Sequence, residues 1–111
     1  MAILSSHTLN GTDGTHAGGI GLTLTNLNTG EVVFTGKMDD GGRLSQKIND
    51  EGIDTEATYE LVFDTTAYWN SLEMIATITQ IALRFKMSNP AGTYHMPVIL
   101  NPNSYSMWSS A

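Results

Sequence analysis

Apolar side chains alternate with small or polar ones at every second position, and this period limits the chain to few folds. The pattern is clearest in residues 20–27, which read IGLTLTNL, and it returns in residues 59–64, which read YELVFD. Successive side chains of a β-strand point to opposite faces of a sheet, so this period indicates strands with one buried face. Eleven glycines and abundant threonines are typical of a β-rich chain with many turns. The sequence therefore predicts an all-β protein.

Turn residues separate further short strands along the chain. Glycine- and aspartate-containing loops follow the first strand and precede the fourth, and Pro and Asn mark another turn near the carboxyl end. We expect a hairpin whose two arms lie on either side of residues 101–104. The other strands are expected at residues 3–9, 31–35, 43–45 and 78–87.

The period changes once, after residue 64. Tyr68, Leu72 and Ile75 recur at helical spacing, and Thr65 or Thr66 can cap the first turn. We therefore expect one short helix of about two turns. About eight strands at this spacing, together with one helix, predict a β-sandwich of two sheets.

Length and charge limit the kind of protein further. The 111 residues fit one domain, residues 1–111, with a single core. No cysteine is present, which excludes disulfides and thiolate chemistry. The net charge of -6 argues against nucleic-acid partners and anionic membranes. The sequence shows neither a signal peptide nor an apolar run that spans a membrane, so we expect a cytoplasmic protein.

Three histidines and one arginine are the candidates for chemistry. His7 and His95 lie on predicted strands, Arg43 follows a Gly-Gly turn, and His16 lies in a glycine-rich loop. Taken singly, each has an ordinary interpretation as a hydrogen-bonded or solvated side chain. We keep that interpretation for His16.

Other kinds of site find little support. His-x-His pairs, His-Glu-x-x-His helices and Cys pairs are missing, so we expect no metal and no cofactor, even though His7 and His95 can meet in space. The sequence also lacks the Gly-x-Ser-x-Gly elbow of many serine hydrolases. Two histidines and an arginine together can support hydrolysis by an activated water. One histidine takes a proton from water, the other holds the water or protonates the leaving group, and the arginine fork binds and stabilises oxygen.

Four segments in the same order resemble the transthyretin-like proteins, especially the 5-hydroxyisourate hydrolases. Residues 3–9 are similar to the family's opening Leu-Ser-x-His-x-Leu, and residues 40–44 to its Asp-Gly-Arg turn, with one extra glycine. Residues 59–65 and Tyr68 match Tyr-x-Leu-x-Phe-Asp-Thr and the tyrosine that follows it. Near the carboxyl end the matching residues are Tyr94, His95, Pro97, Leu100, Pro102, Tyr105 and Ser106.

The resemblance implies a fold, an assembly and a reaction. The fold is a transthyretin-like (prealbumin-like) two-sheet β-sandwich that assembles as a homotetramer, a dimer of dimers. The family's active-site His, Arg and His match His7, Arg43 and His95. The implied reaction is opening of the 5-hydroxyisourate ring by water, a step in urate breakdown and purine metabolism.

The closing residues depart from the family pattern. Trp108, Ser109, Ser110 and Ala111 stand where the family has Tyr-Arg-Gly-Ser, and we assign Tyr105, Trp108, Ser109 and Ser110 to substrate binding. Ser109 replaces a cation, and a charge-assisted hydrogen bond is worth about 1.5–3 kcal/mol. Trp108 adds an aromatic surface on which a flatter substrate can stack. Ser110 comes one position before the family's terminal serine, and its hydroxyl substitutes for it if the strand shifts.

Three functional interpretations stay open. The chain is a 5-hydroxyisourate hydrolase with a tolerant tail, or a redirected enzyme that opens or closes a more apolar heterocycle in a biosynthetic pathway, or a non-enzymatic binder of a small aromatic ligand in a tetramer channel. Retention of His7, Arg43 and His95 favours an enzyme, because a binder needs no such set. The altered tail favours the redirected enzyme over the plain hydrolase.

Overall fold

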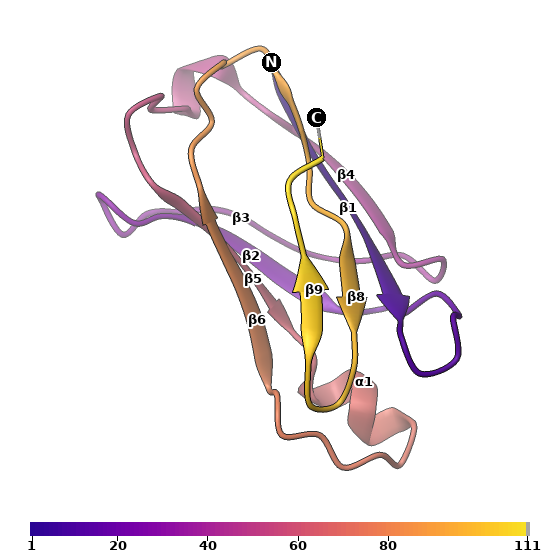
Figure 1. The fold of residues 1–111 in the computed structure, drawn as a ribbon. Helices are drawn as coiled ribbons and strands as arrows, with labels where there is room; N and C mark the ends of the chain where they lie inside the picture. The colour runs from indigo at the N-terminus through magenta and orange to yellow at the C-terminus, as the bar shows by residue number, and fades with distance from the viewer. Residues whose placement is uncertain (111) are drawn as a thin grey trace.

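Two β-sheets packed face to face make up the computed structural model, which describes residues 1–110 (Figure 1). The first sheet has the order β4-β1-β8-β9, with β7 also pairing β1, and the second has the order β3-β2-β5-β6. The predicted all-β sandwich with one short helix is confirmed. The elements of the first sheet are β1 (Ala2–Asn10), β4 (Arg43–Ile48), β7 (Thr93–His95), β8 (Val98–Leu100) and β9 (Tyr105–Met107). The remaining elements are β2 (Gly21–Asn26), β3 (Val32–Lys37), β5 (Tyr59–Asp64), β6 (Gln80–Phe85), the helix α1 (Thr66–Ser71) and a short 3-10 helix, Asp50–Gly52.

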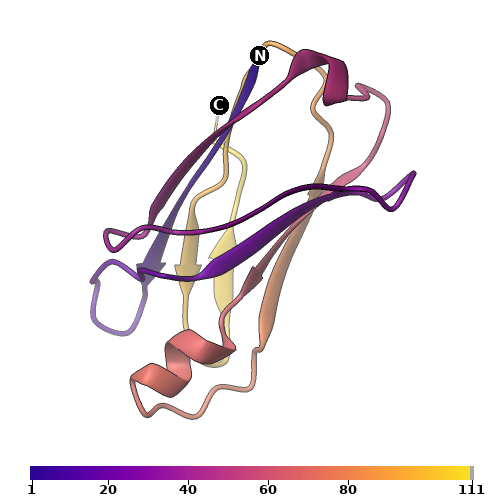
Figure 2. The ribbon, with the colours of Figure 1, turned by 180° about the vertical axis from the view of Figure 1, so that it is seen from behind.

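The core lies between the sheets and follows the alternation of the sequence. Along β1 every second residue is buried, from Ala2 to Asn10, and the residues between them face outward. β5 of the second sheet alternates in the same way and buries Tyr59, Leu61 and Phe63. Figure 2, the view from behind, shows the second sheet in front of β1. One face of each sheet is thus buried in the core, and the other faces outward, where it is available to bind a ligand.

Strand β1 occupies the centre of the first sheet. It pairs antiparallel with β4 on one side and parallel with β7 and β8 on the other. The predicted first arm of the carboxyl-terminal hairpin is therefore two strands, because the chain breaks at Met96 and Pro97 between β7 and β8. The hairpin itself joins β8 to β9 through the predicted turn, where Asn101 N–H donates to the Ser104 carbonyl at 2.9 Å. His95 consequently lies on β7, beside β1.

The helix forms where expected but buries a different residue. It begins after Thr65 and ends at Ser71. The predicted capping by Thr65 or Thr66 is wrong, because both hydroxyls donate to the Thr79 carbonyl at 3.3 Å instead. Its buried side chain is Trp69, whereas Ile75 lies outside the helix and is 95% exposed. The helical spacing of Ile75 was misleading because Glu73 takes a left-handed conformation, φ 57°, that ends the helical path. The strand predicted at residues 78–87 is likewise shorter, since β6 covers six residues.

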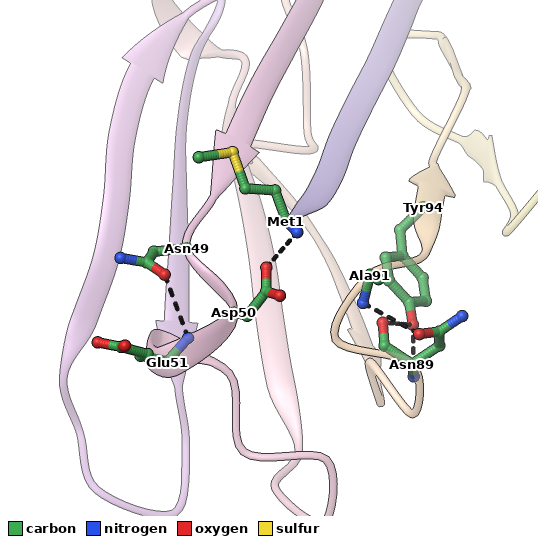
Figure 3. Close-up of polar contacts among 7 residues, drawn as sticks. All are labelled: Met1, Asn49, Asp50, Glu51, Asn89, Ala91 and Tyr94. Atoms are coloured by element: carbon green, nitrogen blue, oxygen red, sulfur yellow. Dashed lines mark hydrogen bonds and ion pairs between the residues drawn. The ribbon is translucent and has the colours of Figure 1, made fainter.

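Polar contacts anchor the loops at one end of the sandwich (Figure 3). The amino group of Met1 pairs with Asp50, and the Asn49 side chain accepts from the Glu51 N–H at 3.3 Å. On the other loop, Tyr94 Oη accepts from the Asn89 N–H at 2.8 Å and donates to the Asn89 carbonyl at 2.7 Å. Tyr94 is thereby held on the core side of β7, so the next residue, His95, faces outward.

No helix in the described part of the chain is long and apolar enough to cross a membrane.

Candidate active site

A row of four polar residues crosses the outer face of the first sheet. Cross-strand pairing sets Ser45 of β4 opposite Ser5 of β1, and Ser5 opposite His95 of β7. An isolated bridge then sets His95 opposite Ser110. Directly paired residues share a face of the sheet. The row therefore brings side chains from both ends of the described chain together.

Arg43 and His7 form a second pair next to this row. They are direct partners in the β1–β4 ladder, two residues along from Ser45 and Ser5. Because side chains two residues apart on a strand share a face, both lie on the outer face with His95. The structure thus gathers the three predicted residues, His7, Arg43 and His95, in one place.

A hollow of about 330 Å³ lies over this part of the sheet. His95 and Arg43 both line it, while His7 flanks it beside Arg43. This volume falls at the lower end of the range for small-molecule sites. The full lining is Ser5, Ser6, Asp39, Arg43, Leu44, Ser45 and His95.

Ser5 holds the His95 ring. Its Oγ lies 2.8 Å from His95 Nδ1. When the hydroxyl donates to Nδ1, the neutral ring carries its hydrogen on Nε2, which is then a donor. The backbone around the ring is fixed as well, because the Met96 N–H donates to the Ser5 carbonyl at 2.9 Å and the Ser110 N–H to the His95 carbonyl at 2.8 Å.

His7 has a partner of its own in His16. Nε2 of His7 lies 2.9 Å from Nδ1 of His16. Our interpretation of His16 as an ordinary loop side chain did not anticipate this contact. The loop folds back on β1, where Leu9 and His16 form a bridge.

The surroundings of His7 favour its neutral form. Burial lowers the pKa of His7 below its ordinary value, and the positive charges of Arg43, His16 and His95 act in the same direction. A hydrogen bond to the Gly41 backbone acts against them but does not reverse the shift. A neutral imidazole can accept a proton, so His7 is suited to act as a base near neutral pH.

Arg43 is positioned by the turn that precedes it. Its N–H donates to the Asp39 carboxylate at 2.8 Å, and its carbonyl accepts from the Asp39 N–H at 2.9 Å. Gly42 takes φ 72°, and a Cβ there would lie 2.4 Å from the Thr8 carbonyl oxygen. The Gly-Gly pair therefore lets the turn pack closely against β1 and present Arg43 beside His7.

The tail residues assigned to substrate binding lie in different places. Ser110 is half-buried beside His95. Trp108, two residues before Ser110, is 43% exposed, and its N–H donates to the Pro97 carbonyl at 3.4 Å. Ser109 is exposed between them. Tyr105 pairs with the buried Leu100, so it faces the opposite side of the sheet from His95.

Ala111, the fourth residue of the altered tail, lies outside the described residues.

Ser5 and His16 are the site residues that sequence reasoning missed. Ser5 stands two positions before His7 on an alternating strand, and that spacing could have placed it on the His7 face. For His16 the sequence carries no such signal, because its position depends on how residues 15–17 pair with β1.

Other features of the described residues fit a catalytic centre less well. Among residues 1–110 no group of three His, Cys, Asp or Glu side chains could hold a metal ion. A larger hollow, about 460 Å³, lies on the outer face of the second sheet, where Lys37 and Asp64 flank Gly21. Its lining contains no histidine. This hollow is larger than the one beside His95, but only the latter is lined by side chains suited to acid–base catalysis.

Comparison with known proteins identifies a family. The family model described as HIUase/transthyretin matches residues 4–109. Two curated relatives are each named 5-hydroxyisourate hydrolase. That of Deinococcus radiodurans is 27% identical over 110 residues, 95% of this chain and 92% of its own length. That of Pseudomonas aeruginosa is 27% identical over 114 residues, 97% of this chain and 90% of its own.

Solved structures agree on the fold. Sea bream transthyretin in complex with thyroxine has a TM-score of 0.85 and 25% identity, covering 97% of this chain and 94% of that one. Klebsiella pneumoniae 5-hydroxyisourate hydrolase has a TM-score of 0.82 and 21% identity, with both chains fully covered. A structure of (S)-allantoin synthase has a TM-score of 0.81 and 24% identity over 99% of this chain, which spans 44% of that longer chain.

Proposed function

The chain belongs to the HIUase/transthyretin family, and from that premise we propose that it is a hydrolase that opens a cyclic amide of a purine-derived ring. Two relatives are named 5-hydroxyisourate hydrolase, which supports this class of reaction. The family also includes transthyretin, whose sea bream form was solved in complex with thyroxine. Membership alone therefore does not decide between an enzyme and a binding protein. The choice rests on the site.

One observation carries the proposal: His7, Arg43 and His95 share one face of the first sheet, beside a hollow of about 330 Å³. These residues come from three separate strands, and sheet pairing brings them together. Hydrolysis of an amide needs a base for water, a cation for the developing oxyanion and a donor for the leaving nitrogen. The three side chains can fill these three roles without a metal or a covalent intermediate.

We assign His7 as the base. It takes a proton from water, whose oxygen attacks the carbonyl carbon of the ring. Arg43 stabilises the negative charge that develops on the carbonyl oxygen, and its planar fork also fits imide or urea oxygens. His95 acts from its imidazolium form, in which Nδ1–H donates to Ser5 Oγ; it gives its Nε2 proton to the nitrogen as the C–N bond breaks and is left neutral.

The experiment is an assay of the purified protein with freshly generated 5-hydroxyisourate. We expect turnover that falls by about two to four orders of magnitude in His7→Ala and in His95→Ala, the usual cost of removing a general acid or base. Circular dichroism and thermal unfolding establish that the variants are folded. Near wild-type rates in both folded variants would show that the assignment is wrong.

A redirected enzyme is the second candidate, and Trp108 is the observation that favours it. Its indole is 43% exposed and its register places it on the face of His95 and Ser110. An aromatic surface there suits a flatter, more apolar heterocycle than 5-hydroxyisourate. Turnover of such a ring, with slow turnover of 5-hydroxyisourate, would support this candidate.

Two further parts of the proposal concern the setting of the enzyme. We propose a homotetramer, because β9 is an edge strand and carries the exposed Tyr105 with Trp108 just beyond it. Light scattering that shows a monomer at micromolar concentration would contradict it. The cytoplasmic location stays a prediction, which cell fractionation tests.

A further inference from the structure

The contact between His7 and His16 has no part in the reaction outlined above. Their facing nitrogens are 2.9 Å apart, and the ring centroids are 5.0 Å apart with the planes tilted by 33°. A hydrogen bond between two imidazoles requires an N–H on one ring and a lone pair on the other. Each ring therefore limits the tautomer of the other.

The backbone fixes His16 in place even though its side chain is exposed. The neighbouring residues are hydrogen-bonded to β1 on both sides: the Asn10 N–H donates to the Thr15 carbonyl at 2.8 Å, and the Ala17 N–H to the Thr8 carbonyl at 2.9 Å. The Thr8 hydroxyl also donates to the Ala17 carbonyl at 2.5 Å. A loop held at these points behaves as a short extra strand. The position of His16 is therefore built into the fold.

Titratable or charged groups face His7 from three neighbouring elements. Arg43 faces it from β4, His95 from β7 and His16 from the loop, and all three oppose a positive charge on His7. The Gly41 backbone, in the turn before β4, favours the charged ring. The carboxylate of Asp39, in the same turn, accepts the Arg43 N–H.

We propose that His16 is a positioning residue for the reaction proposed above: it accepts a hydrogen bond from Nε2 of His7 and so leaves Nδ1 of His7 to take the proton from water. The role of His16 in the reaction rests on the proposed function, whereas the pairing of the two rings rests on the contact itself. When Nδ1 is protonated, His7 carries two N–H donors. His16 Nδ1 still accepts the one at Nε2, so the ring keeps its orientation through the proton transfer.

Two substitutions of His16 separate orientation from charge. His16→Asn supplies a side-chain oxygen close to the position of Nδ1 and can still accept from His7, but it cannot itself take up a proton. His16→Ala removes both the acceptor and the titratable ring. Thr15→Ala is the matched control, because it changes the same loop and its side chain bonds to Asp13 rather than to His7.

Imidazole ¹⁵N NMR of the 111-residue chain tests the geometry without substrate. We expect neutral His7 in the wild type to carry its hydrogen on Nε2, and to keep it there in His16→Asn and Thr15→Ala. In His16→Ala we expect a mixture of tautomers. The pKa of His7 should rise in His16→Asn, because this variant keeps the acceptor and can no longer become positively charged beside His7. It should stay unchanged in Thr15→Ala.

Kinetics tests the role. His16 orients His7 much as an outer-shell partner orients a metal-bound histidine, where loss of the partner costs about 10- to 100-fold, so we expect kcat/KM to fall by about that amount in His16→Ala. For His16→Asn, kcat/KM at the pH optimum should stay within about threefold of the wild-type value. The acidic limb of its pH–rate profile should move to higher pH.

Three results would overturn the inference. In the first, neutral His7 of the wild type carries its hydrogen on Nδ1. In the second, His16→Ala changes neither the His7 tautomer nor kcat/KM. In the third, Thr15→Ala lowers kcat/KM as much as His16→Ala does. A wild type that has no hydrolase activity would instead overturn the proposed function, and the NMR measurement would still decide the pairing.

Discussion

Removing the hydroxyl of Ser5 should slow the enzyme without unfolding it. In Ser5→Ala, His95 loses the hydrogen bond to Nδ1, which is 2.8 Å long. A neutral hydrogen bond contributes about 0.5–1.5 kcal/mol, which corresponds to a fall of roughly 2- to 12-fold in kcat/KM. The fall should appear mainly in kcat, since the hydroxyl orients the His95 ring and does not itself react.

The fold should tolerate this change. The carbonyl of Ser5, which accepts from the Met96 N–H, is untouched, and the β1–β7 pairing stays. We expect the free energy of unfolding to change by less than about 1 kcal/mol, the scale of a half-buried hydrogen bond.

Ser45→Ala is the control for this experiment. Ser45 is the direct neighbour of Ser5 across the β1–β4 ladder and lines the same hollow, but it lies one strand farther from His95. Its loss should leave kcat within about twofold of the wild type. Equal effects of the two substitutions, or no effect of Ser5→Ala, would refute the reasoning that Ser5 orients His95.

Three more predictions concern the arginine, the tail and the turn. Arg43→Lys keeps the charge that lowers the pKa of His7, so turnover should fall while the acidic limb of the pH profile stays in place; Arg43→Gln should also move that limb to higher pH, and an unmoved limb would contradict this. Rebuilding residues 108–111 as Tyr-Arg-Gly-Ser should raise 5-hydroxyisourate turnover; an unchanged, already fast rate would remove the case for a redirected enzyme. Gly42→Ala should lower the free energy of unfolding in urea titrations by about 1–3 kcal/mol, because φ is 72° and the new Cβ would lie 2.4 Å from the Thr8 carbonyl oxygen; unchanged stability would refute it.

Patterns within a single strand predicted most of the fold. Alternation located β2 and β5 to within one residue at each end, and the turn at residues 101–104 predicted the β8–β9 hairpin. The helix was harder, because its spacing could not reveal the left-handed Glu73 that leaves Ile75 outside. Local pattern thus identified the elements better than their limits.

The site depended on pairings that no local pattern contains. Family resemblance selected His7, Arg43 and His95, and the strand registers place them on one face. The same registers turn Tyr105 to the other face. His16 escaped prediction because its place is set by hydrogen bonds between the loop and β1.

The central position of β1 also has a consequence for synthesis and folding. This strand leaves the ribosome before residues 93–100, which pair with one of its two edges. Until those residues emerge, that edge is open to pairing with another chain. Contacts so distant in sequence also favour slow folding. The strand that carries Ser5 and His7 therefore also needs protection from aggregation while the protein is being made.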